Sequence, residues 1–554
     1  MYYEELVKIY SRLEKTAKRL EKVEIISEFL KNISKDETSM VVNLLQGKVY
    51  ADWEELKLGV SEKIVLKIIN QSTGIPQSKI EELWKKMGDL GKVSEKLIKE
   101  KHQRTLTSKK LTLDKVYKNL RRLSEFQGKG TVGRKVSLIT ELLTNASPDE
   151  ARHIINTVIG DLRVGVAAGI IRDSVAKAFD RDVGEIEDNY NVSADYGKVA
   201  ELCKEGRLEL RLSPGKPVKL MLSIKVENIN EAFEAVGKPA QCEFKLDGFR
   251  LQCHFDEEEI KLFTRNMENV TKQFPDVVKY LKENVKGKNY ILDSEAAGIK
   301  EGRYTPFQSI SQRIKRKYNI EKMARDFPIE LNVFDVIYYN EKNLMNEPLS
   351  KRRELLEKII NEKKGRIVLT KKLVSDDEKK VKKFYDEALK AGTEGLMIKN
   401  LDSKFIPGRY VNGWVKLKPV LEPLDLVITG ATWGEGKRSN WLSSFIVSCR
   451  DKDRFLEVGR VGSGVKEKNE GIKFSELTKE LKKLITKISG KEVEVRPMIV
   501  LEVSYEEIQK SPSYSSGYAL RFPRVLNLRF DKPLSEVNTL RDVERIYNLQ
   551  RGRK

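Results

Sequence analysis

A four-residue stretch near the middle of the chain, Lys245-Leu-Asp-Gly248, combines an amine, a carboxylate and a turn residue. The apolar residues Phe244, Leu246 and Phe249 around it predict strand, turn and strand, with Lys245 at the end of the first strand. A lysine amine becomes a nucleophile once it loses its proton, which burial or nearby cations favour. The alternative is a solvated lysine on a hairpin surface, because Asp-Gly is a common hairpin turn.

Carboxylates that could hold a metal ion follow farther along the chain. Asp293 and Glu295 lie two apart in a predicted strand and therefore project from the same face, and Glu394 begins another strand. Carboxylate oxygens of this kind hold Mg²⁺ beside a triphosphate. The alternative is that these are ordinary acidic residues at strand edges.

Cations and an aromatic ring complete a set of groups suited to a nucleotide. Lys416 and Lys418 share one face of a predicted strand, and Arg265 could join them in clamping phosphates. Phe334 offers a flat apolar surface for a purine ring. Singly, each has an ordinary explanation as a solvated cation or a core phenylalanine, so their order and spacing carry the prediction of a nucleotide site.

The spacing of apolar residues divides the chain into three predicted domains. Residues 1–216 have few prolines and repeated helical spacing, which predicts an all-α domain that ends near Ser213-Pro-Gly-Lys-Pro217. In residues 217–420 short strands alternate with helices, which predicts an α+β catalytic domain. Residues 421–554 contain about five predicted strands and a helix, as in a small OB-fold β-barrel.

One helix start is marked clearly in the first domain. Ser147 as N-cap, followed by Pro148, predicts a helix that ends at Gly160. In the other domains the expected strands are 290–295, 329–337, 395–399, 414–418, 424–429, 444–448, 455–461, 498–504 and 524–530, and the expected helices are 351–361, 376–390 and 474–485.

The composition favours a nucleic-acid partner and a reducing compartment. The formal net charge is +21, 34% of residues are charged and no apolar run reaches membrane length, so a polyanion suits the chain better than a lipid bilayer. The cysteines and histidines are scattered without a Cys-x-x-Cys pair, which argues against a disulfide framework or a zinc ribbon. The first residues do not resemble a signal peptide, and we expect an intracellular, cytoplasmic protein.

Two glycine-containing stretches of the helical domain are candidates for phosphate contacts. The loop 128–135 combines glycines with basic residues, and the segment 160–172 should place a helix N-terminus near Gly160. A solvated loop and close helix packing are the respective alternatives. The candidate DNA-binding cations are Lys129, Arg134, Lys135, Arg163 and Arg172.

Taken in order, the motifs resemble those of the ATP-dependent DNA ligases of the archaeal and eukaryotic replicative type. The matching blocks are Lys245-Leu-Asp-Gly-Phe-Arg250, Thr264-Arg-Asn266, Leu292-Asp-Ser-Glu295, Phe334-Asp335, Glu394-Gly-Leu-Met-Ile-Lys399, Trp414-Val-Lys-Leu-Lys418, and Arg521-Phe-Pro-Arg524 with Arg529-Phe-Asp-Lys532. The resemblance extends over nearly the full length. It implies a helical DNA-binding domain at 1–216, an adenylation (nucleotidyltransferase) domain at 217–420 and an OB-fold domain at 421–554.

The resemblance also implies an activity and a role for each matching residue. Nicks in duplex DNA would be sealed through AMP-lysine at Lys245 and an adenylated 5′-phosphate, in replication, repair and recombination. The other implied contacts are Glu243 on the adenine side, Phe334 stacked on the base, Arg250 and Glu295 at the ribose or metal, Arg265 at the ribose-phosphate region, Glu394 at the metal, Lys416 and Lys418 at the α-phosphate, and Arg524 and Lys532 at the pyrophosphate when the OB domain closes. Arg409 is a further expected nucleotide contact, one position nearer to Pro407-Gly408 than in relatives.

The cofactors and partners implied by the resemblance are ATP, Mg²⁺ and nicked double-stranded DNA. We expect a monomer that associates with the nucleoid and has no membrane contact. A sliding clamp is a further expected partner near Gln103, although Gln103-Arg-Thr-Leu-Thr107 lacks both aromatic residues of a clamp-binding sequence.

Two other classes of protein fit part of the pattern. An RNA ligase or capping-type nucleotidyltransferase also carries Lys-x-Asp-Gly before an OB barrel, but the long helical region and Arg521-Phe-Pro-Arg524 argue against it. A catalytically silent DNA-binding scaffold would not need Lys245, Glu394 and Lys416 together. Labelling with ATP or GTP separates ligation from capping, and any covalent labelling excludes the scaffold.

Overall fold

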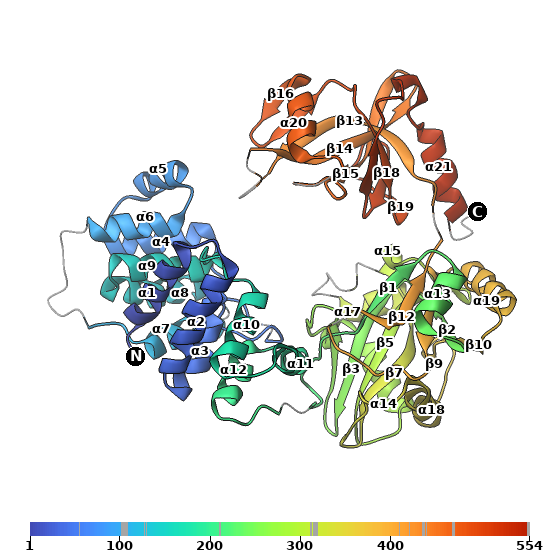
Figure 1. The fold of residues 1–554 in the computed structure, drawn as a ribbon, viewed down its shortest axis with the longest axis horizontal. Helices are drawn as coiled ribbons and strands as arrows, with labels where there is room; N and C mark the ends of the chain where they lie inside the picture. The colour runs from blue at the N-terminus through green and yellow to red at the C-terminus, as the bar shows by residue number, and fades with distance from the viewer. Residues whose placement is uncertain are drawn as a thin grey trace.

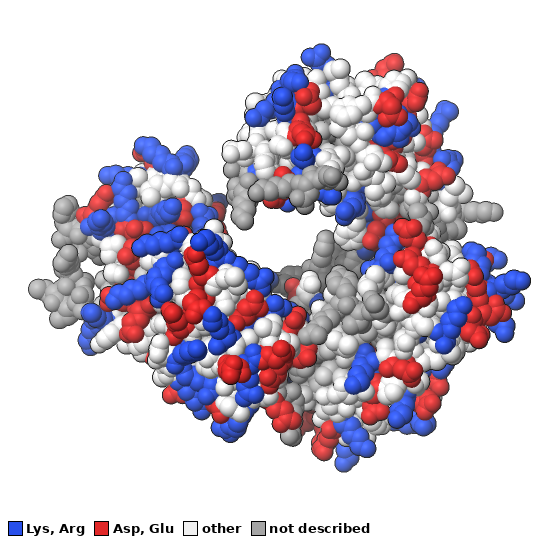
Figure 2. Space-filling view, viewed as in Figure 1, with Lys and Arg blue, Asp and Glu red and all other residues white. Residues whose placement is uncertain are grey.

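The computed structural model describes residues 1–54, 56–100, 109–126, 128, 130–209, 212–310, 313, 319–408, 410–419, 421–434, 438, 440–467 and 471–550. The predicted residues Gln103, Lys129 and Arg409 lie outside these ranges. Figure 1 shows an all-helical N-terminal region, a central region of sheets and helices, and a β-rich C-terminal region. They surround an opening that the space-filling view in Figure 2 also shows. The predicted fold class is confirmed, whereas the domain boundaries at 216 and 420 stay predictions.

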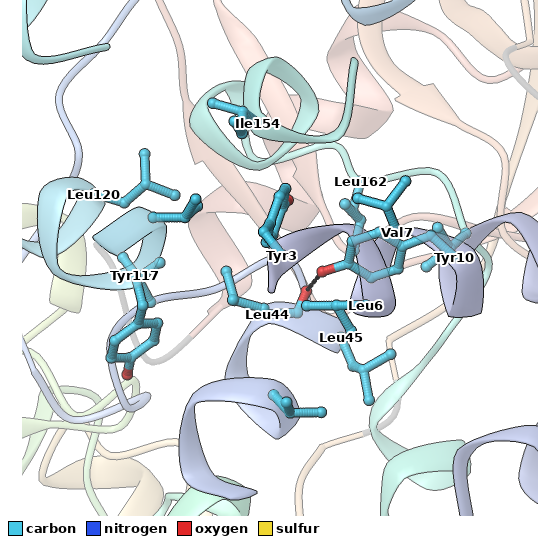
Figure 3. Packing of buried hydrophobic residues seen from close by; sticks show 14 of the residues in the cluster. Tyr3, Leu6, Val7, Tyr10, Leu44, Leu45, Tyr117, Leu120, Ile154 and Leu162 are labelled. Atoms are coloured by element: carbon cyan, nitrogen blue, oxygen red, sulfur yellow. Dashed lines mark hydrogen bonds between the residues drawn. The ribbon is translucent and has the colours of Figure 1, made fainter. Parts of the chain in front are cut away.

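The N-terminal region consists of helices whose apolar faces meet in one core. Figure 3 shows part of it, where Tyr3 and Tyr10 of α1 pack near Leu44 of α3. The buried Tyr10 hydroxyl donates to the Leu44 carbonyl oxygen at 3.0 Å, which avoids the cost of an unpaired polar group. The helices are α1 Tyr3–Glu14, α2 Arg19–Asn32, α3 Lys35–Leu45, α4 Glu62–Thr73, α5 Gln77–Met87, α6 Leu90–Lys99, α7 Leu113–Arg122, α8 Thr131–Asn145, α9 Pro148–Ile159, α10 Ala168–Ala178, α11 Val183–Ser193 and α12 Tyr196–Lys204.

Helix α9 begins and ends where the sequence predicts. The Ser147 hydroxyl accepts from the backbone N–H of Glu150 at 3.3 Å, and Pro148 lies in the first turn. Gly160 ends the helix with a φ of 82°, a conformation that glycine adopts without strain. The expected helix N-terminus near Gly160 is therefore wrong, because the next helix begins only at Ala168.

The central region contains two sheets. One has the strand order β1-β12-β11-β2-β10, and the other β4-β3-β5-β7-β8 with β6 on β5 and β9 on β7. Their strands are β1 Leu222–Val226, β2 Ala240–Lys245, β3 Phe249–Asp256, β4 Ile260–Thr264, β5 Asn289–Lys300, β6 Arg303–Thr305, β7 Ile329–Tyr339, β8 Lys342–Asn343, β9 Ile367–Leu369, β10 Lys372–Ser375, β11 Gly395–Asn400 and β12 Tyr410–Leu417. The helices are α13 Ile229–Val236, α14 Pro275–Asn284, α15 Phe307–Ile310, α17 Ile320–Asp326, α18 Leu349–Ile359 and α19 Glu378–Lys390, with a 3-10 turn η1 Thr271–Gln273.

The predicted strand, turn and strand around Lys245 are present, but they do not form a hairpin. Strands β2 and β3 belong to different sheets, so the chain crosses from one sheet to the other at Leu246–Gly248. A Cβ at Gly248 would lie 2.3 Å from the carbonyl oxygen of Ala296 in β5. Gly248 thus permits close packing between the backbones of the turn and β5.

The C-terminal region is built on a curled sheet with more strands than the sequence predicts. Its order is β15-β14-β13-β17-β16, with β18 between β13 and β21, and a single bridge from Ser463 to Arg524 links its far sides. The additional elements are β16, β17, the separate hairpin β19-β20 and α21. The elements are β13 Leu424–Trp433, β14 Leu442–Asp451, β15 Arg454–Val461, α20 Phe474–Lys482, β16 Ile485–Ser489, β17 Glu492–Val495, β18 Val500–Ser504, β19 Glu507–Lys510, β20 Tyr518–Arg521, β21 Arg524–Leu528, η3 Leu534–Glu536 and α21 Leu540–Leu549.

No helix in the described part of the chain is both long enough and apolar enough to cross a membrane.

Candidate active site

Most residues predicted to bind the nucleotide line one cavity of about 670 Å³ between the two central sheets and the C-terminal region. They are Glu243, Lys245, Arg250, Arg265, Glu295, Phe334, Glu394, Lys416 and Lys418. This volume is typical of a small-molecule site. The pairing of the strands explains why these residues lie together. Strand β2, which ends at Lys245, pairs with β11, and β11 pairs with β12, so Lys416 in β12 and Lys418 just after it lie near Lys245.

Lys245 lies in an ion-paired cluster at this end of the sheet. Its Nζ is 2.6 Å from Oε2 of Glu394, and Nζ of Lys418 is 2.8 Å from the same oxygen. The backbone fixes this arrangement, because the N–H of Glu394 donates to the Lys245 carbonyl oxygen at 2.7 Å. Lys418 also contacts Glu506 of the C-terminal region at 2.9 Å. An anionic phosphate that enters the cluster would meet ammonium groups already in place.

The electrostatics of the cluster keep Glu394 ionised. Burial would raise the pKa of Glu394, but the charges of Lys245 and Lys418 outweigh it and hold that pKa well below its ordinary value. Burial, followed by the charges of Lys418 and Lys245, lowers the pKa of Lys416. For Lys418, burial opposes the charged form, but Glu394 and Glu506 raise the pKa above its ordinary value.

Glu295 differs from Glu394 although both line the cavity. Burial raises the pKa of Glu295 to about 8. The charges of Lys245 and Arg250 oppose this rise, whereas those of Glu394 and Asp247 add to it. Its Oε1 accepts from the N–H of Gly248 at 3.2 Å, which ties β5 to the turn after Lys245. The carboxyl group is thus oriented toward the turn that follows Lys245.

Arg250 and Phe334 form one wall of the cavity. The Arg250 guanidinium donates to Asp293 through Nε at 3.1 Å and Nη2 at 2.7 Å, and it lies 5.5 Å from the Phe334 ring centroid. Asp293 is fully buried and engaged by this bidentate pair. Asp293 therefore orients Arg250, and the cavity itself presents Glu295 rather than both acidic residues of β5.

The end of the cavity near Glu243 contains a buried lysine that was not among the predicted site residues. Nζ of Lys399 is 2.6 Å from Oε2 of Glu243, 4.0 Å from the ring centroid of Trp414 and 4.8 Å from that of Phe334. Burial lowers the pKa of Lys399, although the negative charge of Glu243 opposes this shift. Lys399 is the last residue of the motif that begins at Glu394, so its position in that motif was enough to select it from the sequence as a site residue.

The C-terminal region contributes residues other than the expected ones. Arg521 and Phe522 line the cavity, and Nη1 of Arg521 is 3.6 Å from Oδ1 of Asp247. Arg524 and Lys532 lie outside the cavity; Arg524 is exposed, and Lys532 forms an ion pair with Asp425. Their contact with the pyrophosphate stays a prediction and requires a different placement of this region. The missed Arg521 begins the same Arg-Phe-Pro-Arg motif.

The candidate DNA-binding cations lie in the helical region, away from this cavity. Nζ of Lys135 is buried and donates to the Leu58 carbonyl oxygen at 2.6 Å, so this group holds the helical region together. Arg134 lies 5.5 Å from the ring centroid of Phe126. Arg163 pairs with Asp89 and Asp161, and Arg172 pairs with Asp173 and Glu187. Contacts of these cations with DNA stay predictions.

The donor set fits a divalent cation bound together with a nucleotide. Among the residues that the structure describes, no group of three or more His, Cys, Asp or Glu side chains forms a ready-made metal site. Glu295 and Glu394 nevertheless line the same cavity beside cationic side chains. Mg²⁺ is commonly held by one or two carboxylates plus substrate phosphates, and these two glutamates would supply that part of its coordination.

Two sheets that enclose a lysine, acidic residues and a row of cations define a nucleotidyltransferase. Family models match in three places: "DNA ligase N terminus" at residues 1–176, "ATP dependent DNA ligase domain" at 220–418 and "ATP dependent DNA ligase C terminal region" at 438–532. The chain belongs to the ATP-dependent DNA ligases of the archaeal type, enzymes that seal nicks in duplex DNA. This finding excludes the silent scaffold and the RNA-ligase and capping alternatives.

Curated relatives match over essentially the whole chain. The DNA ligase of Nanoarchaeum equitans is 46% identical and the alignment covers 100% of this chain and 99% of the relative. The DNA ligase of Thermococcus fumicolans is 40% identical with 99% coverage of both, and that of Archaeoglobus fulgidus is also 40% identical with 99% coverage of both. A solved structure titled "Pmar-Lig_PreS3" shares the fold with a TM-score of 0.58 at 18% identity, covering 95% of this chain and 99% of that chain.

Proposed function

We propose that Lys245 is the nucleophile that takes AMP from ATP. The observation that carries this proposal is the convergence of Lys245, Glu394 and Lys418 within 2.8 Å contacts in a nucleotide-sized cavity. The Lys245 ammonium first loses a proton to water. Its nitrogen then forms a bond to the α-phosphorus, and the bond from that phosphorus to the pyrophosphate oxygen breaks.

The residues around Lys245 hold the reacting phosphate. Lys416 and Lys418 face the α-phosphate, and their charges offset the negative charge that develops during transfer. Glu295 and Glu394 would hold Mg²⁺, which would supply positive charge that neutralises the phosphates. Glu394, which pairs with Lys245 in this structure, would be one of the two residues that hold the cation.

The other cavity residues bind the nucleoside. Phe334 stacks on the adenine, and Glu243, held by Lys399 at 2.6 Å, faces the edge of the base. Arg250 and Arg265 reach the ribose and its phosphate, and both line the cavity. The bidentate pair between Arg250 and Asp293 fixes the guanidinium before the nucleotide arrives, so that little ordering is left for binding.

Two further transfers then seal the nick. AMP passes from Lys245 to the 5′-phosphate of nicked duplex DNA, which frees the lysine amine. The 3′-hydroxyl oxygen attacks that activated phosphorus, its proton is lost, and AMP leaves as the phosphodiester bond forms. We propose that the enzyme acts as a monomer in replication, repair and recombination in the nucleoid, with a sliding clamp as a further partner near Gln103.

Nucleotide labelling and sealing test this proposal together. Wild-type enzyme should become labelled by α-labelled ATP with Mg²⁺, not by GTP, and should seal a nicked duplex with ATP. Lys245→Arg should lose labelling and sealing, because the guanidinium stays protonated. Lys261→Arg is the matched control, since Lys261 lies on neighbouring β4 and pairs with Glu259 outside the cavity. Labelling of Lys245→Arg at the wild-type level would contradict the assignment.

A further inference from the structure

The segment that joins the helical region to the central region is packed into the core of the central region. Leu212, Val218 and Met221, which precede β1, are buried in an apolar cluster with residues of the central sheets. Val192 of helix α11 packs against the same cluster. The two regions therefore share apolar contacts around this segment.

On one side, the segment is bonded to strand β3. The N–H of Val218 donates to Oε1 of Gln252 at 3.0 Å, and Nε2 of Gln252 donates to the Val218 carbonyl oxygen at 2.8 Å. The N–H of Gly215 donates to Nδ1 of the buried His254 at 3.2 Å. These bonds fix the segment to the central region.

On the other side, the same segment is bonded to the helical region through Lys219. Its N–H donates to the Asn191 carbonyl oxygen at 3.0 Å, and its Nζ donates to the Tyr190 hydroxyl at 3.0 Å. The Tyr190 hydroxyl in turn donates to Oδ2 of Asp52 at 2.6 Å. The Tyr190 ring is stacked on Tyr196 at 3.7 Å between centroids, so its position within the helical region is fixed.

The electrostatic surroundings of this chain of contacts suit a buried polar link. Burial lowers the pKa of Lys219 against the charge of Asp52. Burial would raise the pKa of Asp52, but Lys48 and the Tyr190 hydroxyl outweigh it and lower that pKa. Removing one member leaves another without its partner in a partly buried place, which is costly.

The segment ends in the wall of the active-site cavity. The Met221 carbonyl oxygen accepts from Nη1 of Arg250 at 2.9 Å, and Leu222 and Ser223 line the cavity. Lys219 therefore stands two to four residues along the chain from Met221, Leu222 and Ser223. Its contact with the helical region thus sets where that region lies relative to this wall.

We propose that Lys219 is a positioning residue for the DNA steps of ligation, because with Tyr190 and Asp52 it fixes the helical region relative to the nucleotide cavity. This inference rests on the proposed function, in which Lys245 takes AMP before DNA is used. Transfer from ATP to Lys245 uses groups of the central and C-terminal regions alone. Transfer to a nick also requires that DNA held by the helical region be aligned with the cavity, and misalignment of reacting groups is costly.

Two variants remove the link in different ways. Lys219→Met keeps the aliphatic stem and removes the ammonium, whereas Tyr190→Phe keeps the stacked ring and removes the hydroxyl. Lys219→Arg restores a cation over the Tyr190 ring, which the native Nζ contacts at 4.2 Å from the centroid. The matched control is Lys216→Met, because Lys216 lies exposed in the same segment and loses the same charge.

The readouts separate the steps. With α-labelled ATP and Mg²⁺, all variants should become labelled at the wild-type rate. In single turnovers on a duplex with a pre-adenylated nick, Lys219→Met and Tyr190→Phe should seal on the order of tenfold more slowly. Lys219→Arg should recover part of that loss, and Lys216→Met should seal at the wild-type rate. Thermal melting identifies a variant that fails to fold. In that case the sealing rate of the other variant tests the inference.

Distinct results would overturn the inference. Normal sealing of the pre-adenylated nick by Lys219→Met and Tyr190→Phe would show that the link does not position the helical region. A parallel loss of labelling and sealing would assign Lys219 to the nucleotide cavity instead. Failure of the wild-type enzyme to become labelled would contradict the proposed function itself, and not the positioning role of Lys219.

Discussion

At the residue scale, the two glutamates of the cavity have pKa values shifted in opposite directions. Glu394 lies within 2.8 Å of two ammonium groups and its pKa is lowered, whereas burial raises the pKa of Glu295 to about 8. Near neutral pH these shifts favour the carboxylate form of Glu394 and the protonated form of Glu295. Environments that shift the pKa values of two acidic groups apart in this way are typical of catalytic sites.

Gly248 gives a prediction at this scale. A Cβ there would lie 2.3 Å from the Ala296 carbonyl oxygen, so Gly248→Ala must push β5 away from the turn after Lys245. We expect a loss of about 1–3 kcal/mol in the free energy of unfolding, measured by denaturant titration, and a lower rate of labelling by ATP.

The control for Gly248→Ala is Gly133→Ala. Gly133 lies inside α8, and a Cβ there would meet no atom within 4 Å, so the substitution should raise the free energy of unfolding by up to about 1 kcal/mol. A neutral Gly248→Ala would show that the close approach between the turn and β5 is not needed.

The sequence was sufficient for residues whose types form ordered motifs. Lys245, Glu394 and Lys418 were selected from the sequence and meet in the cavity. Glu506 was missed because it follows β18 in the C-terminal region, and only tertiary structure brings it to Lys418. Arg521 was missed in favour of Arg524, since spacing within a motif does not show which of two arginines faces another domain.

At the element scale, apolar spacing predicts strands but not their partners. The strands on both sides of Lys245 were predicted, yet they belong to different sheets, because alternation shows which face is buried and says nothing of the neighbouring strand. The short hairpins β16-β17 and β19-β20 were missed, since strands of four or five residues give weak patterns. The helix start expected near Gly160 was misplaced for another reason, because residues 161–167 are not helical and α10 begins only at Ala168.

Strand β3 gives a prediction for pH dependence. Burial lowers the pKa of His254 to about 3, below the value of about 6.5 for an unfolded chain. Above pH 6.5 both states are neutral and stability is complete; as the pH falls toward 3, the unfolded state binds the proton first and stability is lost. The cost is up to about 1.4 kcal/mol per pH unit, and His254→Asn should flatten the decline in melting temperature.

Part of the acid sensitivity should remain in His254→Asn. Burial also lowers the pKa of His153, to about 4, and that group lies in the helical region. Melting curves between pH 7 and pH 4 should therefore show a smaller slope for the variant, not a flat line. Identical slopes for variant and wild type would mean that His254 is not buried as a neutral ring.

At the scale of the whole molecule, positive charge on the face seen in Figure 2 is distributed rather than confined to one patch. Figure 2 shows Lys and Arg interspersed with Asp and Glu on the visible face around the opening, and the chain carries a net charge of +21. We expect binding to nicked duplex DNA to weaken by about a thousandfold or more between about 50 and 200 mM salt, because many phosphate contacts release counterions. Fluorescence anisotropy measures this slope, which should not depend on base sequence.

A reaction that does not involve DNA provides the contrast. Labelling of Lys245 by ATP in the absence of DNA should depend much less on salt, since it involves a few enclosed charges. A DNA affinity that hardly changes with salt, or that changes with base sequence, would contradict backbone recognition by this ligase.

The most direct test is peptide mapping by mass spectrometry after incubation with ATP and Mg²⁺. The account predicts one AMP adduct, on the peptide that contains Lys245, which disappears when nicked DNA is added and is absent from Lys245→Arg. An adduct on any other residue, or one that persists in Lys245→Arg, would contradict the assignment of Lys245 as the nucleophile.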